Sequence, residues 1–135
     1  MSMSGRCLCG AVTYVAEGPA VFAGFCYCNH CRRSTGSHSA IVAVMESTFS
    51  MSGDVREYAT VGDSGKEVAR MFCPTCGTGI LARPAARPGV ILIKAGTLDD
   101  PEQFKPMACI YVSRAPSWDQ PMEGIAAFPE ARPAS

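Results

Sequence analysis

Three cysteines, Cys26, Cys28 and Cys31, lie close together in the chain, and two arginines, Arg32 and Arg33, follow at once. Thiolate sulfur is a preferred ligand of Zn²⁺, which takes four ligands in a tetrahedral arrangement. Three thiolates from one short segment leave one coordination position that the segment itself does not fill. The spacing therefore predicts a zinc site with an open position, which is the arrangement that catalytic zinc sites share.

A second group of four cysteines consists of two short pairs far apart in the sequence. Cys7 and Cys9 form a C-x-C pair, and Cys73 and Cys76 form a C-P-x-C pair followed by glycine. Two such pairs complete one tetrahedral site when the fold brings them together, and four sulfurs leave no position for water or substrate. We expect this group to hold a structural zinc.

The fourth ligand of the three-cysteine site is left open by the sequence. Water, a substrate thiol, His30, His38 or Cys109 could complete it. If Cys109 did so, both sites would be structural, and the protein would be a non-enzymatic zinc module that binds a protein partner. If the three thiols were exposed without a firmly held metal, thiol redox exchange or zinc handling would be the function.

Residues beside the three cysteines indicate what an open site would bind. The positive charges of Arg32 and Arg33 favour thiolate formation and attract anions, so an anionic substrate that carries a thiol fits this environment. Tyr27 lies between two of the cysteines and is a further candidate for substrate contact. The other candidates for substrate contact or proton transfer are Lys94, Lys105 and His38.

Composition limits the classes of function. The chain has 135 residues, enough for one domain with a buried core. Lys plus Arg and Asp plus Glu are both 12, so the formal charge of zero provides no general attraction to nucleic acid or to an anionic membrane. We expect a single zinc-binding domain over residues 1–135, with its core at about residues 5–118 and an Ala/Pro-rich tail at residues 126–135.

The cysteine content also bears on the cellular compartment. No run approaches the ~20 apolar residues that a membrane-spanning helix needs, and the first residues lack the apolar segment of a secretion signal. We therefore expect a cytoplasmic protein, in which thiols stay reduced and eight cysteines favour metal binding over disulfides. Exposed strand edges would allow a homodimer.

Short apolar segments separated by turns predict a mainly β protein. Glycine and proline, 13 and 10 residues respectively, mark many of the turns. The segment 90–95 is the most apolar, and we expect it to be a central strand buried on both faces. One short helical turn is expected at residues 29–34, ended by Gly36. The other expected strands are 11–16, 39–45, 48–52, 55–60, 66–72, 78–83 and 109–112. We expect 55–60 and 66–72, which are separated by a polar turn, to form a hairpin.

Taken together, the cysteine motifs resemble those of the glutathione-dependent formaldehyde-activating enzymes, the GFA family. The resemblance rests on CLCG at residues 7–10, CYCNHCRRSTG at residues 26–36, CPTCG at residues 73–77 and GTLDDP at residues 96–101. It implies an Mss4-like fold of packed antiparallel sheets stapled by zinc. Two positions differ from the family pattern: Tyr27 stands where histidine is typical, and Cys109 where histidine is common.

The same resemblance implies two Zn²⁺ ions per chain and a reaction. The implied structural zinc is held by Cys7, Cys9, Cys73 and Cys76. The implied catalytic zinc is held by Cys26, Cys28 and Cys31. The implied reaction forms S-hydroxymethylglutathione from formaldehyde and glutathione, which is a carbon-sulfur lyase reaction in reverse. We therefore expect a zinc-dependent lyase that joins or splits a small thiol such as glutathione and an aldehyde such as formaldehyde.

Overall fold

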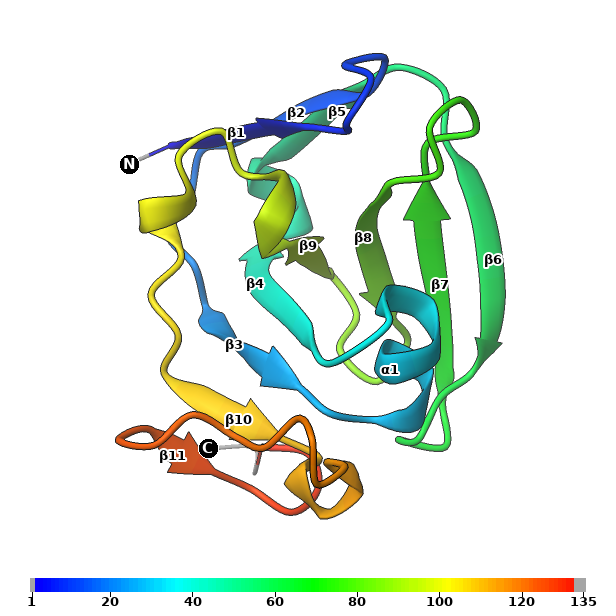
Figure 1. Cartoon of the computed structure of the whole chain (residues 1–135). Helices are drawn as coiled ribbons and strands as arrows, with labels where there is room; N and C mark the ends of the chain where they lie inside the picture. Colours follow the sequence, from blue (N-terminus) through cyan, green and yellow to red (C-terminus); the bar gives the residue numbers. More distant parts are fainter. Residues whose placement is uncertain (1, 133–135) are drawn as a thin grey trace.

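The computed structural model describes residues 2–132 and contains two β-sheets (Figure 1). The smaller sheet is antiparallel, with the order β1-β2-β5. Its strands are β1 (Met3–Arg6), β2 (Thr13–Ala16) and β5 (Phe49–Ser52). The larger sheet has the order β11-β10-β3-β4-β9-β8-β7-β6. Its strands are β3 (Phe22–Cys26), β4 (Ser39–Met45), β6 (Arg56–Val61), β7 (Glu67–Phe72), β8 (Gly79–Pro84), β9 (Val90–Lys94), β10 (Ala108–Ile110) and β11 (Ala126–Ala127).

One α-helix, α1 (Asn29–Thr35), lies in the described part of the chain and follows β3 directly. Short 3₁₀ turns occupy Glu46–Thr48, Ala95–Thr97, Pro101–Gln103 and Val112–Arg114. The predicted fold class, mainly β with packed sheets and one short helix after the cysteine motif, is confirmed. Within residues 2–132, no helix has the length and apolarity that crossing a membrane requires.

Three strands were not predicted from the sequence, namely β1, β3 and β11. Each is short and contains glycine or alanine in place of the β-branched residues that favour strands. They are extended because neighbouring strands supply their hydrogen-bond partners: β3, for example, pairs with β4 on one side and with β10 on the other. Pairing with distant segments therefore overrides weak local preference here.

Side-chain alternation makes the two faces of the larger sheet different. On β9, Ile91 and Ile93 point to the face that packs against the smaller sheet and are completely buried. Val90, Leu92 and Lys94 point to the opposite face, are only partly buried and line a cavity. The strand is central, as predicted, because it lies between β4 and β8. The expectation that it is buried on both faces is wrong, because one face borders the cavity.

Helix α1 begins and ends at residues with clear capping geometry. Cys28 is extended at the N-cap, and its Sγ accepts a hydrogen bond from the Cys31 N–H at 3.3 Å. Gly36 ends the helix with a φ of 98°, which favours glycine, and its N–H donates to the Arg32 carbonyl at 2.8 Å. The predicted helical turn and its glycine stop are confirmed, and the helix fixes two of the three clustered cysteines.

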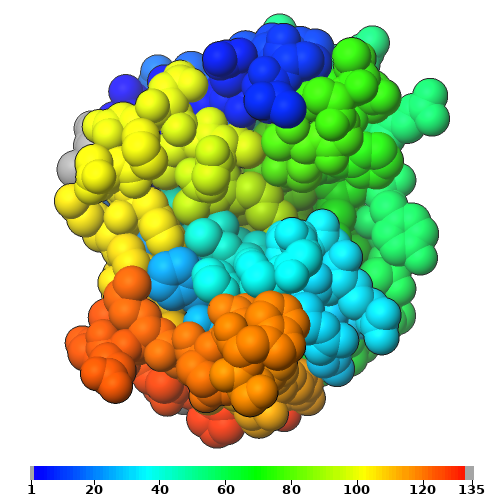
Figure 2. Space-filling model, viewed as in Figure 1, coloured from blue at the N-terminus to red at the C-terminus, as the bar shows by residue number. Residues whose placement is uncertain are grey.

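The C-terminal segment is packed against the larger sheet. Strand β11 pairs in parallel with β10, and the Phe128 N–H donates to the Cys109 carbonyl at 2.8 Å. Figure 2 shows the orange C-terminal segment against the cyan part of the chain that contains α1. Asp119 makes that contact, because its carboxylate accepts hydrogen bonds from the His38 N–H at 2.9 Å and from His38 Nδ1 at 2.8 Å. Residues beyond 118 are thus part of the folded domain.

Candidate metal centres and active-site cavity

The first cysteine cluster joins the smaller sheet to the larger one. Cys7 and Cys9 follow β1, while Cys73 and Cys76 follow β7. The four Sγ atoms lie within 4.8 Å of one another. Cys9 Sγ is 3.6 Å from Cys7 Sγ and 3.8 Å from Cys73 Sγ. Four sulfurs held at ~2.3 Å around one zinc ion would be roughly 3.8 Å apart, so this donor set fits a closed tetrahedral site.

Tight turns around this cluster supply hydrogen bonds to sulfur. Gly77 has a φ of 78°, and its N–H donates to the Cys73 carbonyl at 2.8 Å. The Val12 N–H donates to Cys7 Sγ at 3.3 Å. The Thr78 hydroxyl lies 3.1 Å from Cys76 Sγ, and this contact lowers the pKa of Cys76 to about 5. The two contacts with sulfur, from Val12 and Thr78, favour the thiolate, which is the form that binds zinc.

The second cluster lies where β3 ends and α1 begins. Cys26 is the last residue of β3, Cys28 caps α1, and Cys31 lies in the first turn of the helix. Their Sγ atoms lie within 4.8 Å of one another, and all three residues are buried. Among residues 2–132, no histidine, carboxylate or further cysteine joins this cluster. The donor set suits zinc with three protein ligands and one open position.

The electrostatic surroundings favour negative charge on Cys31. Hydrogen bonds from the Cys26 and Cys28 thiols lower the pKa of Cys31, and the positive charges of Lys94 and Arg70 lower it further. The contacts with Cys28 and Cys31, together with burial, raise the pKa of Cys26. The cluster therefore shares negative charge among sulfurs that lie beside two cationic side chains.

Cys109 is excluded from the second cluster by strand register. Strands β3 and β10 are parallel neighbours, and Cys26 is paired with Ile110, while Cys109 is paired with Phe25. Successive side chains on a strand point to opposite faces, so Cys109 points away from the face that carries Cys26. Cys109 is completely buried on that other face, and burial raises the pKa of its thiol.

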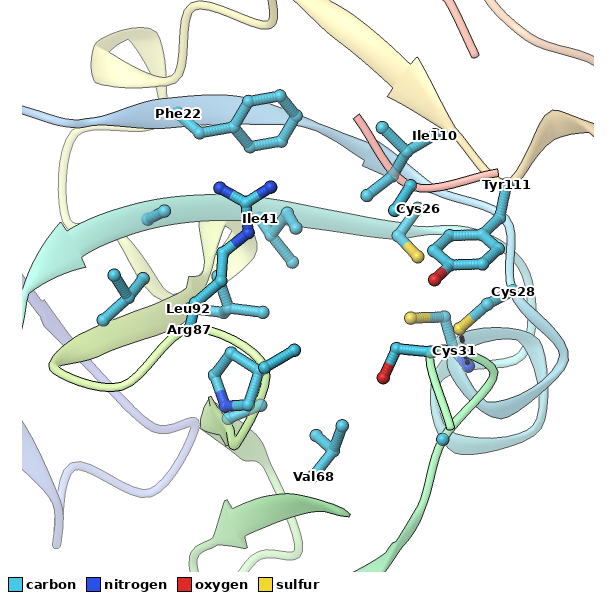
Figure 3. Close-up of a pocket in the computed structure, with 18 of the residues that line it drawn as sticks. Phe22, Cys26, Cys28, Cys31, Ile41, Val68, Arg87, Leu92, Ile110 and Tyr111 are labelled. Atoms are coloured by element: carbon cyan, nitrogen blue, oxygen red, sulfur yellow. Dashed lines mark hydrogen bonds between the residues drawn. The ribbon is translucent and has the colours of Figure 1, made fainter. Parts of the chain in front are cut away.

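A cavity of about 280 Å³ opens from the second cluster (Figure 3). The three cysteines form one end of it, together with the Tyr111 ring, and Phe22 and Arg87 lie at the other end in Figure 3. The side chains between the two ends are apolar. Those labelled in Figure 3 are Ile41, Val68, Leu92 and Ile110.

Lys94 and Arg70 introduce positive charge into the wall near the cysteines. Lys94 Nζ donates a hydrogen bond to Ser39 Oγ at 2.7 Å, and burial lowers the pKa of this lysine. Both cations line the cavity. Lys94 is a candidate from the sequence, whereas Arg70 is not, because the pairing of β7 with β8 that brings Arg70 to this face cannot be seen in a local pattern.

Tyr111 is a further functional candidate that the sequence did not indicate. It directly follows β10, and its φ of 57° is the one positive value at a residue other than glycine in the described chain. Such a conformation is costly for an aromatic residue and is often found at functional sites. Figure 3 shows its hydroxyl pointing toward the sulfurs of Cys26 and Cys28. Burial raises the pKa of this hydroxyl.

The three residues expected from the sequence to contact substrate do not line the cavity. Tyr27, Arg32 and Arg33 are not among the residues that line the cavity. Tyr27 is buried, its hydroxyl donates to the Gln120 carbonyl at 3.4 Å, and its ring centroid lies 5.0 Å from that of His38. Arg32 Nη1 donates to Asn29 Oδ1 at 3.1 Å on the surface of α1.

The two histidines and Lys105 also lie outside the cavity lining. His30 Nε2 lies 3.9 Å from Asp63 Oδ1, and His38 is held by Asp119. Neither histidine belongs to a cysteine cluster. Lys105 is exposed.

Comparisons with known proteins identify the family and the fold of this chain. Residues 2–114 match the family model described as glutathione-dependent formaldehyde-activating enzyme. A crystal structure of a Rhodobacter sphaeroides protein has a similar fold, with a TM-score of 0.61 and 21% sequence identity over 93% of this chain and 99% of that chain. No curated protein matches this chain significantly. Because the family match covers most of the sequence, the chain belongs to the glutathione-dependent formaldehyde-activating enzyme family, whose name links glutathione and formaldehyde, and its two cysteine clusters suit zinc.

Proposed function

We propose that this protein is a zinc-dependent carbon-sulfur lyase that joins a small thiol, such as glutathione, to an aldehyde, such as formaldehyde, or splits their adduct. One observation carries the proposal: the three-cysteine cluster forms the end of a cavity, whereas the four-cysteine cluster already has a full set of sulfur ligands. Cys26, Cys28 and Cys31 are the proposed ligands of a catalytic zinc. Membership of the family supports the choice of thiol and aldehyde.

The other zinc would be structural in this proposal. Its ligands would be Cys7, Cys9, Cys73 and Cys76, with no position left for substrate. The residues of the two pairs are far apart in sequence, since Cys9 and Cys73 are separated by 64 positions. Closing such a long loop stabilises the fold by restricting the unfolded chain. This zinc would hold β1 and β7 together and thereby position the cavity walls.

A zinc ion bound by the three thiolates would stabilise a substrate thiol in its nucleophilic thiolate form at neutral pH. Addition to the aldehyde forms one carbon–sulfur bond and breaks the carbonyl π bond. The proton that leaves the thiol ends on the new hydroxyl oxygen, so the reaction needs no oxidant or reductant. The reverse reaction breaks the carbon–sulfur bond and returns both reactants.

The protein would contribute concentration, orientation and hydrogen bonding to this addition. The Tyr111 hydroxyl points toward the cysteines and, with its raised pKa, stays protonated, so it can donate a hydrogen bond to the oxygen that gains charge. Lys94 and Arg70 would attract anionic reactants toward the cysteine end of the cavity. These three residues replace Tyr27, Arg32 and Arg33 as the proposed substrate contacts.

The alternative of a non-enzymatic module with two closed sites required Cys109 as the fourth ligand. The register of β10 with β3 argues against it, because Cys109 points away from Cys26. We further propose a cytoplasmic location, supported by eight cysteines that are all free thiols in this structure. The homodimer stays a prediction of the sequence.

Sulfur coordination tests the proposal directly. X-ray absorption on the zinc-loaded protein should give fewer than four sulfurs per zinc on average, and glutathione should raise that average, because its thiol would fill the open position. A glutathione analogue with a methyl group in place of the thiol is the control and should leave the average unchanged. An average of four sulfurs per zinc before any thiol is added would contradict the open site, and so would an unchanged average with glutathione.

A further inference from the structure

The cavity is larger than formaldehyde needs and its middle section is apolar. Its volume is about 280 Å³, whereas a single water molecule needs only ~15 Å³ measured in the same way. Between the cysteine end and the arginine end, the wall consists mainly of the side chains of Ile41, Val68, Ala82, Leu92 and Ile110. These five residues come from five strands, β4, β7, β8, β9 and β10, whereas the charged side chains of Arg70 and Lys94 lie nearer the cysteines. A one-carbon aldehyde would leave most of this surface without a partner.

The end of the cavity away from the cysteines carries the positive charges of two arginines. Arg132 and Arg87 both line it; the Arg132 guanidinium lies 4.8 Å from the centre of the Phe22 ring, and Arg87 Nη2 donates to the Arg132 carbonyl at 3.4 Å. No ion pair joins either arginine to a carboxylate within residues 2–132. An anionic group at this end would find two cationic partners.

The acidic residue that lines the cavity does not neutralise this end. Asp63 lies at the tip of the β6–β7 hairpin, and its Oδ2 is 3.2 Å from Arg114 Nε. The same oxygen accepts a hydrogen bond from the Asn29 N–H at 3.1 Å, and Oδ1 lies 3.9 Å from His30 Nε2. Asp63 is thus already paired with groups outside the arginine end.

We propose that the cavity binds a carboxylate with an unbranched apolar chain, whose far end carries the reacting thiol or carbonyl group. The carboxylate would lie at Arg87 and Arg132, the chain along the apolar walls, and the reacting group at the cysteines. The identity of the reacting group rests on the function proposed above, whereas the apolar chain and the carboxylate rest on the cavity alone.

Glutathione fits the same walls poorly. Its two amide groups and its ammonium group would face the apolar middle section, whose side chains offer no hydrogen-bond partners. Each buried polar group left unpaired lowers affinity by about tenfold or more. A chain of methylene groups instead gains about fourfold in affinity for each group that it buries.

Calorimetric titration of the zinc-loaded protein with butanoate, hexanoate and octanoate tests the cavity without any reacting group. We expect the affinity to rise about fourfold for each added methylene group, and therefore on the order of 10²-fold from butanoate to octanoate. Octanoate should also bind more tightly than glutathione. Equal affinity for the three acids, or tighter binding of glutathione than of octanoate, would overturn the proposal.

Matched variants test each end of the ligand. Val68→Asn places an amide in the wall and should reduce octanoate affinity by tenfold or more, whereas Val15→Asn on the exposed face of β2 should not change it. Arg87→Gln should weaken all three acids by a similar factor, and Arg56→Gln, on exposed β6, should not. Because Arg87 lies on an exposed loop, Arg87→Gln should fold normally. It therefore tests the proposal even if Val68→Asn does not fold. An unchanged affinity in Arg87→Gln would overturn the assignment of the carboxylate.

The reacting end is tested with 8-sulfanyloctanoate and 8-oxooctanoate, which differ only in that group. The thiol acid should raise the number of sulfurs per zinc if the chain carries the thiol, and the oxo acid should instead be consumed with glutathione if the chain carries the aldehyde. If the chain-length series behaves as expected but neither probe reacts or changes the coordination, the proposed function fails and the cavity proposal stands. If glutathione alone raises the sulfur number and the acids do not bind, the cavity proposal fails and the function stands.

Discussion

Cys26 and Cys109 lie on adjacent parallel strands, yet their side chains point to opposite faces of the larger sheet. The partner of Cys26 across the strand pair is Ile110, one residue beyond Cys109. A shift of one residue in this register would have placed Cys109 among the three clustered cysteines and closed the open position. The register of β10 therefore leaves this cluster with three cysteines in place of four.

Cys109→Ala should leave the zinc content and the sulfur coordination unchanged. The Cys109 thiol is buried away from the cluster, so its removal leaves only a small cavity and should cost roughly 1–2 kcal/mol in the free energy of unfolding. Zinc analysis, X-ray absorption and denaturant unfolding measure these quantities. Loss of one zinc ion in this variant would mean that Cys109 is a ligand.

The two proposed zinc sites should respond differently to loss of a cysteine. Cys28→Ser should lose one zinc ion and remain folded, because the four-cysteine cluster would still join the two sheets. Cys73→Ser should lose the structural zinc and unfold at much lower temperature, because zinc binding at such sites contributes directly to folding. Zinc content and thermal unfolding, measured in parallel for both variants, make the comparison. Equal effects on stability would contradict the division into a structural and a catalytic site.

Tyr111→Phe should slow the addition of thiol to aldehyde without weakening thiol binding. The ring and its packing remain, but the hydroxyl that points toward the cysteines is lost. Removal of one hydrogen-bond donor to a developing oxyanion costs on the order of 10²-fold in kcat, with little change in KM. Tyr27→Phe is the matched control, because Tyr27 does not line the cavity, and it should retain kcat. A purely structural role for Tyr111 would instead lower the unfolding temperature and leave kcat intact.

Asp119→Ala should loosen the C-terminal segment without removing zinc. Its carboxylate accepts hydrogen bonds from the backbone and the ring of His38, so the variant loses both and should cost about 1–3 kcal/mol in the free energy of unfolding. Denaturant unfolding of Asp119→Ala measures the loss, and Asp54→Ala, at an exposed turn, is the control. A stability equal to that of the control would show that the His38–Asp119 contact does not hold this segment.

Local pattern was sufficient for several features because their causes are local. Cysteine spacing identified both clusters, and glycine after the α1 segment marked its end, since a φ of 98° at Gly36 favours that residue. The central position of β9 followed from its continuous apolar run. The β6–β7 hairpin followed from two strand-like segments separated by a polar turn.

Other features depend on which segments pair, and pairing involves residues far apart in the chain. Strand register brings Arg70 and Lys94 to the cysteine end of the cavity and keeps Cys109 away from it. Strand pairing also places one face of β9 beside the cavity, so that this face is only partly buried. The amino-acid sequence thus specified the two cysteine clusters that suit zinc, through the chemistry and spacing of the cysteines. The three-dimensional fold selected the side chains around them, because a strand presents alternate residues to opposite faces and only its neighbours fix which face is which.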